Sequence, residues 1–183
     1  MSRLFLAYWP SPAKAAEIRP WVQQAHSLYG GRMMRPDTLH MTLAFLGRAA
    51  PAQVQALVSD CAGWRLPAGS LLLNEPGRFP RAKVVWLGPS SPGSSALAWL
   101  HDAHERLWSY LAPWGWQPRE AVFRPHVSLL RKAGPGDLAA LRGRPVEWTP
   151  GRCVLAGSLP TAARSRYILL ADVPLEAVAD ADT

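Results

Sequence analysis

Two short stretches of the chain each place a hydroxyl residue two positions after a histidine. Thr42 follows His40 in this way, and Ser128 follows His126. Residues i and i+2 of a β-strand point to the same face, so each stretch would present an imidazole beside a hydroxyl. Imidazole titrates near neutral pH, so one ring can accept a proton while the other donates one. The pattern therefore predicts acid–base catalysis on a group held between the two histidines.

The residues around the two histidines suit a phosphate group. The hydroxyls of Thr42 and Ser128 can hydrogen-bond its non-bridging oxygens, and Arg131, three residues after Ser128, can neutralise its charge. Such a phosphodiester site needs no metal ion. A single His-x-Thr stretch often arises by chance, whereas two copies, each after an Arg-Pro pair, favour a functional pair.

Both stretches must lie on strands for this geometry to hold, and the alternation of apolar residues around them predicts that they do. The core side of the first strand would carry Leu39, Met41, Leu43 and Phe45. Strands are expected over residues 3–9, 39–46, 70–73, 83–87 and 122–130 and around Trp148, Val154 and Ile168. Helices are expected over residues 12–30, interrupted at Pro20, and over 51–64, 96–111 and 136–141.

Strands and helices are mixed without the regular alternation of a doubly wound sheet, which predicts the α+β class. The two histidine stretches lie 86 residues apart, and each follows a strand and a helix. This repetition of the histidine pattern within the chain predicts two similar lobes that face each other, with the histidines between them.

Length and composition indicate one domain over residues 1–183. Two distant cysteines, Cys61 and Cys153, argue against a disulfide framework or a zinc site. The apolar run at residues 4–9 is too short to span a bilayer and lacks the features of a signal peptide. We therefore expect a soluble cytoplasmic protein with no membrane partner, and a monomer.

The chain is basic, with 20 Lys and Arg against 13 Asp and Glu, and four of those acids lie after Tyr167. A basic body suggests an anionic partner such as RNA. The excess of Arg over Lys also fits a GC-rich genome, so charge alone leaves both readings open. The acidic tail over residues 174–183 is expected to be disordered.

At these residues the sequence resembles the two-histidine (2H) phosphoesterase superfamily, and more closely its bacterial and archaeal RNA 2′,3′-cyclic phosphodiesterases, historically called 2′-5′ RNA ligases. The resemblance covers nearly the whole chain. It is carried by residues 3–7, 39–47, 85–88 and 123–129. Ser128 stands where threonine is commoner in the family, and this difference keeps the hydroxyl.

The resemblance implies two pseudo-symmetric lobes, each an antiparallel sheet backed by helices, with the active-site cleft between them. It implies a hydrolase that opens a terminal 2′,3′-cyclic phosphate of RNA, such as a tRNA fragment, or of a cyclic nucleotide, to a 2′-phosphomonoester without a cofactor. His40 would protonate the departing 3′ oxygen and His126 would activate water; the sequence alone gives the pair but not these roles. Thr42 and Ser128 would hold the phosphate oxygens, with Arg131 as an additional ligand. Joining of RNA ends through a 2′-5′ linkage would use the same site.

Other residues offer weaker alternatives. His101 and His104 lie one helical turn apart but lack a complementary pair of metal ligands, so a solvent-facing helix side is expected. Arg35 and Arg124 are further candidates for contacting RNA. Trp114 or Trp116 offers a ring for stacking on a base. A non-catalytic module that binds RNA ends is the alternative function, although such a module would have little need for two matched histidines.

Overall fold

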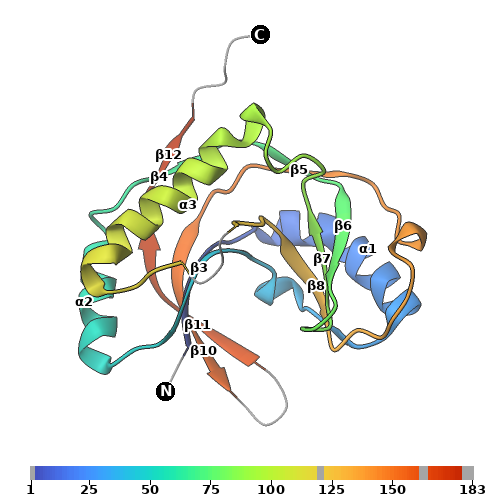
Figure 1. Cartoon of the computed structure of the whole chain (residues 1–183), viewed down its shortest axis with the longest axis horizontal. Coiled ribbons are helices and arrows are strands. Elements are labelled where there is room, and N and C mark those ends of the chain that lie inside the picture. Colours follow the sequence, from blue (N-terminus) through green and yellow to red (C-terminus); the bar gives the residue numbers. More distant parts are fainter. Residues whose placement is uncertain (1–2, 119–121, 161–164, 179–183) are drawn as a thin grey trace.

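The computed structural model describes residues 3–118, 122–160 and 165–178 (Figure 1). Its α-helices are α1 (Pro12–Tyr29), α2 (Pro51–Cys61) and α3 (Ala98–Leu111). Short 3-10 turns span Pro36–Thr38, Ser95–Leu97, Ala112–Trp114 and Leu138–Ala140. The strands are β1 (Arg3–Tyr8), β2 (Arg32–Met33), β3 (Met41–Arg48), β4 (Leu66–Ala68), β5 (Leu71–Leu73), β6 (Glu75–Phe79), β7 (Val84–Gly88), β8 (Val127–Arg131), β9 (Val146–Trp148), β10 (Cys153–Pro160), β11 (Ser165–Val173) and β12 (Leu175–Ala177).

One eight-stranded sheet runs through the molecule; its first half consists of β11, β10, β1 and β3, and its second half of β8, β7, β6 and β2. Its strands run in the order β11-β10-β1-β3-β8-β7-β6, and β2 pairs with β8 outside this path. All the pairings within it are antiparallel. β3 of the first half and β8 of the second meet at a single residue pair, Met41 opposite Val127. This confirms the α+β class and brings the two histidine stretches to one junction.

Helices cover the two halves separately. α1 packs on β8 and β2, whereas α3 packs on β3 and α2 on β11; Figure 1 shows α1 on the right and the other two helices on the left. The helix expected over residues 96–111 is confirmed as α3, and it buries one apolar face. Its buried residues include Leu100, Leu107 and Leu111, and Leu97 is buried just before it.

The expected break of the first helix at Pro20 is wrong. α1 begins after Ser11, whose side chain accepts a hydrogen bond from the Lys14 amide, and it continues through Pro20 to Tyr29. A proline inside a helix costs a backbone hydrogen bond. Here the helix buries Ile18 and Trp21 on either side of the exposed Pro20, and this packing offsets that cost.

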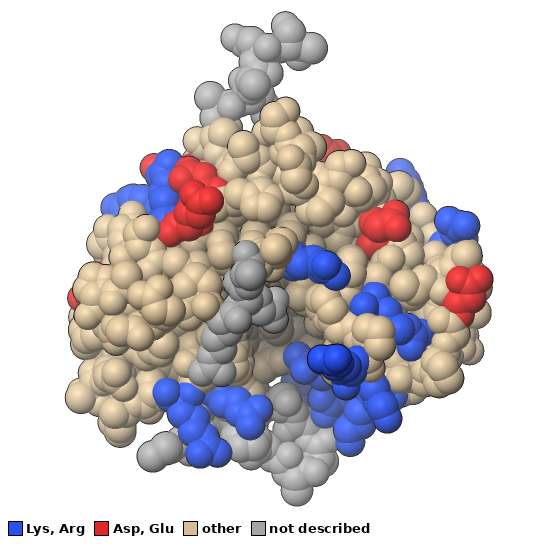
Figure 2. All heavy atoms as spheres, in the orientation of Figure 1, with Lys and Arg blue, Asp and Glu red and all other residues tan. Residues whose placement is uncertain are grey.

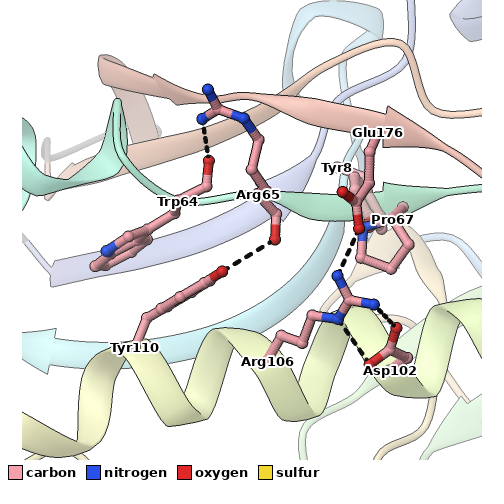
Figure 3. Close-up of polar contacts among 8 residues, drawn as sticks. All are labelled: Tyr8, Trp64, Arg65, Pro67, Asp102, Arg106, Tyr110 and Glu176. Atoms are coloured by element: carbon pink, nitrogen blue, oxygen red, sulfur yellow. Dashed lines mark hydrogen bonds and ion pairs between the residues drawn. The ribbon is translucent and has the colours of Figure 1, made fainter.

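Residues 174–178 are ordered, in contrast to the disordered tail expected from the sequence. β12 pairs in parallel with β4, and Arg106 of α3 forms ion pairs with Asp102 on its own helix and with Glu176 on β12 (Figure 3). The same face of α3 places the Tyr110 ring on Trp64. Residues 179–183 lie outside the described residues.

Two further expectations are corrected around the second histidine. The strand begins at Val127 rather than at residue 122, so His126 lies just before it, as His40 lies just before β3, which begins at Met41 rather than at residue 39. The helix expected over residues 136–141 is a single 3-10 turn, which is capped by the Asp137 side chain and ends where Leu141 becomes extended. None of the described helices is both long and apolar enough to cross a membrane.

Candidate active site

The rings of both histidines are held by the same kind of hydrogen bond to the backbone. The Nδ1 atom of His40 lies 2.8 Å from the carbonyl oxygen of Thr38, and that of His126 lies 2.8 Å from the carbonyl oxygen of Arg124. A carbonyl only accepts, so Nδ1 carries the proton in both rings. In the neutral form the lone pair that can accept a proton is then on Nε2 in each ring, which makes Nε2 the candidate atom for proton transfer. The two halves therefore prepare their histidines alike.

A bulge in β8 brings Arg131 to the face that carries Ser128. Trp86 of β7 lies opposite Ser128, while the preceding Val85 lies opposite Leu130, so Leu129 is an extra residue in β8. Strict alternation would have turned Arg131 to the other face, and one extra residue restores it. The positive charge of Arg131 acts on His40, which shows that the two lie within electrostatic reach.

A matching bulge occurs in β3 and overturns one expectation. Ala7 of β1 lies opposite Thr42 and Leu6 lies opposite Ala44, so Leu43 is the extra residue. Phe45 was expected in the core; it is 42% exposed, because the bulge turns it to the face of Thr42. We call β3 and β8 the histidine strands, because each begins directly after a histidine. The open face of each one thus carries a hydroxyl and, three residues later, a large side chain.

His40 lies in an aromatic cage. Trp9 stacks on its ring at 5.2 Å between ring centroids, Phe5 lies at 4.9 Å, and Tyr167 meets it edge-on at 5.3 Å. The residue is only 9% exposed. Burial lowers the pKa of His40 to about 4, against the hydrogen bond to Thr38, and the nearby Arg131 and His126 lower this pKa further. His40 is therefore neutral in the free protein at pH 7.

His126 is half-buried between two aromatic rings of the second half. Phe79 meets its ring edge-on at 4.9 Å, and Trp86 lies at 5.8 Å. Trp86 lies flat over Gly77 of β6, where a Cβ atom would come within 1.9 Å of the indole. Gly77 thus allows Trp86 to reach under the histidine.

Sequence reasoning missed these five aromatic residues. Phe5, Trp9, Tyr167, Phe79 and Trp86 come from β1, the residue that follows it, β11, β6 and β7. Their neighbours along the chain carry no signal, because only sheet pairing brings them to the histidines. Trp114 and Trp116, singled out in the sequence for base stacking, instead pack partly buried against the core.

Basic side chains gather on one face of the molecule. Figure 2 shows Lys and Arg below and to the right of the centre of this face, with Asp and Glu nearer its margins. A cavity of about 660 Å³ adjoins the site and is lined by Arg131, Tyr167 and Thr38 among others. Arg35 also lines it but is bound to Asp37 at 2.8 Å. Arg124 is exposed and lies over the Phe79 ring.

The remaining candidates lie apart from the two histidine strands. His101 and His104 do not form a plain solvent-facing side. His104 stacks on Phe123 at 4.1 Å and accepts a hydrogen bond from Trp108, and burial lowers its pKa to about 4. Within the described residues, no three His, Cys, Asp or Glu side chains are placed to hold a metal ion. Cys61 and Cys153 are both buried, and burial raises the pKa of both thiols.

Comparison with protein families gives one match that spans most of these elements. The model of the 2′-5′ RNA ligase superfamily matches residues 10–157, a range that includes both histidine strands and the cavity-lining part of α1. The chain belongs to the 2′-5′ RNA ligase superfamily. The resemblance seen in the sequence is thereby confirmed.

Relatives within this superfamily are similar over most of their length. The RNA 2′,3′-cyclic phosphodiesterase of Escherichia coli (strain K12) is 34% identical over 132 residues, 72% of each chain. That of Aeropyrum pernix is 30% identical over 120 residues, 64% of this chain and 66% of its own. The crystal structure of E. coli LigT complexed with 3′-AMP superposes with a TM-score of 0.78 at 29% identity, covering 95% of this chain and 98% of that one.

Proposed function

We propose that the chain is an RNA 2′,3′-cyclic phosphodiesterase that opens a terminal cyclic phosphate to a 2′-phosphomonoester, with His40 and His126 as its acid–base pair. The names of the superfamily relatives support the activity. The observation that carries the mechanism is the matched anchoring of the two rings. Each Nδ1 atom is committed to a carbonyl two residues earlier, at 2.8 Å, so each Nε2 atom is left to handle a proton.

The proposed reaction adds one water to the cyclic phosphate. Nε2 of His126 takes a proton from the water while its oxygen attacks phosphorus in line with the bond to the 3′ oxygen. That bond breaks, and Nε2 of His40 gives its proton to the 3′ oxygen as it leaves. The phosphate stays on the 2′ oxygen. General acid–base catalysis of this kind contributes a factor of about 10²–10⁴ for each group.

The donor role of His40 requires a proton that the free protein does not hold at pH 7. Burial and the charge of Arg131 keep the pKa of His40 near 4. A bound phosphodiester anion would face both groups and favour the charged imidazole, so we propose that His40 gains its proton as substrate binds. An imidazolium in this setting is a strong acid, which suits protonation of an alkoxide leaving group.

The hydroxyls of Thr42 and Ser128 and the guanidinium of Arg131 are the proposed ligands of the phosphate oxygens. Thr42 and Ser128 share the open face with the histidines through the alternation of a strand, and the bulge in β8 turns Arg131 to that same face. In this proposal the guanidinium of Arg131 neutralises the charge of the phosphate, and the reaction uses no metal ion or cofactor. A 5′-hydroxyl of RNA in place of water would give a 2′-5′ linkage by the same proton transfers.

The experiment that tests this function is incubation with a short RNA ending in a 2′,3′-cyclic phosphate, in excess chelator, followed by identification of the product. A 2′-monophosphate is expected. A 3′-monophosphate would show that the cleft aligns the other P–O bond. An intact cyclic phosphate with RNA bound to the protein would overturn the enzyme and favour a module that binds RNA ends.

A further inference from the structure

The cavity beside the site extends well beyond the catalytic residues. Three of its lining residues belong to the site: Arg131, Thr38, whose carbonyl holds His40, and Tyr167, which meets the His40 ring. The others come from α1, β2 and the turn before β3. Its volume of about 660 Å³ is within the range of ligand pockets, so it has room for more than one phosphate.

One side of α1 presents polar groups to this cavity. Arg19, Gln23 and His26 are exposed and lie at positions i, i+4 and i+7, which form a single stripe on a helix. His26, which is not one of the two histidines of the proposed acid–base pair, lines the cavity with them. Met33, 45% exposed on β2, adds an apolar surface nearby. Among the described residues that line the cavity there is no Asp or Glu.

The strongest observation is a pair of arginines placed directly opposite each other. Arg32 of β2 is the cross-strand partner of Arg131 of β8. Like charges in this position destabilise a sheet. Gly31 holds the two strands close, since a Cβ atom there would come within 2.8 Å of the carbonyl oxygen of Arg131. Among the described residues, Arg32, Arg131 and Arg19 form no ion pair with a carboxylate.

Two opposed arginines without acidic partners are stabilised when anions lie against them. One anion is the cyclic phosphate itself, which the histidines and Arg131 would hold. Arg32 and Arg19 extend the positive charge from Arg131 into the cavity, away from the reacting phosphate. A cyclic mononucleotide has no second phosphate to place there. An RNA has one, on the 5′ side of its last nucleotide.

We propose that this cavity binds the phosphodiester on the 5′ side of the terminal nucleotide, through Arg32 and Arg19, and so selects RNA chains over cyclic mononucleotides. The inference rests on the proposed function, because it assumes that the cyclic phosphate occupies the histidine site. Arg35 is not part of this subsite, because Asp37 already neutralises it.

The test compares kcat/KM for a dinucleotide that ends in a 2′,3′-cyclic phosphate with kcat/KM for the corresponding cyclic mononucleotide. The wild-type chain, Arg32→Gln and a control, Arg65→Gln, are measured side by side. The control removes the same charge at a residue that does not line the cavity; the Arg65 side chain donates hydrogen bonds to the backbone carbonyls of Ala62 and Trp64, the second of which is drawn in Figure 3. Each substrate is measured over a range of salt concentrations.

In wild type and Arg65→Gln the dinucleotide is expected to be the better substrate. In Arg32→Gln the ratio of the two kcat/KM values is expected to fall about tenfold, as for loss of one charged hydrogen bond. The salt dependence of kcat/KM for the dinucleotide should also weaken, by about 0.7 in its log–log slope. Equal losses for both substrates, or no change in the ratio, would overturn the subsite.

Failure of the proposed function gives a different result. If the wild-type chain turns over neither substrate, the enzyme reading fails and the subsite is then judged by binding. A dinucleotide ending in a 2′-phosphate is titrated against wild type and Arg32→Gln, with nucleoside 2′-monophosphate as the reference ligand. Weaker binding of the dinucleotide alone in Arg32→Gln supports the subsite; equal binding by the two proteins rejects it.

Discussion

The two histidine strands, β3 and β8, have the same backbone arrangement but different surroundings. Each anchors the Nδ1 atom of its histidine on a carbonyl two residues earlier, places a hydroxyl two residues later, and contains a bulge directly after that hydroxyl. Around His40, three aromatic rings leave the imidazole almost without access to water. His126 has two aromatic neighbours and remains half-buried. The same hydrogen bond to a backbone carbonyl thus holds both imidazoles in the same tautomer, while the difference in burial gives them different environments.

That difference is what an acid–base pair requires. Two titratable groups take different roles when their environments favour different protonation states. Burial makes the charged form of His40 costly, and in the proposed mechanism the bound anion offsets that cost, so that His40 gains its proton with the substrate. Four predictions test this difference, in decreasing order of expected effect: substitution of the histidines, stability of the protein in acid, substitution of the hydroxyl residues and substitution of Arg131.

The largest effect is expected from His40→Asn and His126→Asn. The amide nitrogen of asparagine can still donate to the carbonyl of Thr38 or Arg124, so the local backbone is kept while Nε2 is lost. Each variant should lose about 10²–10⁴ in kcat on a cyclic phosphate. The double variant should be little worse than either single one, because the groups act as a unit.

His104→Asn serves as the control for this series. It removes a histidine whose pKa is also lowered by burial, but which lies on α3 and contacts Phe123 and Trp108. Its kcat is expected to stay within a few-fold of wild type. Strongly additive losses in the double histidine variant would mean that His40 and His126 act independently, against the acid–base pair.

The second prediction concerns stability in acid. The pKa of His40 is about 4 in the folded protein and about 6.5 in the unfolded chain, so only the unfolded state binds a proton between these values. The folded state therefore loses stability as the pH falls from about 6.5 to about 4, by on the order of 3 kcal/mol from this residue. Urea unfolding of wild type and His40→Asn at pH 7 and pH 4 measures the loss.

In His40→Asn the difference between the two pH values should shrink by that amount. His104 adds a loss of the same sign, so the variant is not expected to become independent of pH. His26→Asn changes an exposed ring and is the matched control. An acid-induced loss in His40→Asn equal to that of wild type would show that the cage does not hold His40 neutral.

The shared features of the two strands were predictable from sequence, and their differences were not. A period of two places Thr42 with His40 and Ser128 with His126 from local information alone. The positions of Phe45 and Arg131 depend on bulges, which arise when one strand meets a partner from elsewhere in the chain. Local alternation therefore predicts the wrong face for Phe45.

The aromatic cage and the opposed arginines are equally non-local. Trp9 and Tyr167 meet at His40 from distant parts of the chain, and Arg32 meets Arg131 only because β2 pairs with β8. The continuation of α1 through Pro20 also depends on tertiary packing, because burial of residues on both sides of the proline offsets the backbone hydrogen bond that the proline removes. Long-range pairing also turned part of the acidic tail into β12.

The third prediction tests whether the two hydroxyls are equivalent. Thr42→Val and Ser128→Ala each remove one hydrogen bond to a charged phosphate and should lower kcat/KM about 10- to 100-fold. Ser128→Thr restores the residue of the first strand and should stay within a few-fold of wild type, as should Thr42→Ser. Steady-state kinetics on one cyclic phosphate measures all four variants. A loss confined to one strand would show that the phosphate is held by one half only.

The smallest effect is expected at Arg131, and it tests the link between the two halves. Arg131 lies on the strand of His126, yet its charge lowers the pKa of His40 across the junction. In Arg131→Gln the pKa of His40 should rise from about 4 toward its ordinary value, by less than burial has lowered it, because burial is the larger cause. An NMR titration of the imidazole measures this pKa. Arg35→Gln is the control, because the charge of Arg35 is already paired with Asp37. Inorganic phosphate should raise the same pKa in wild type and do so less in Arg131→Gln, since an anion between Arg131 and His40 favours the imidazolium. If phosphate left the His40 pKa unchanged in wild type, the anion would not lie between the two halves, and the proposed arrival of the proton with the substrate would fail.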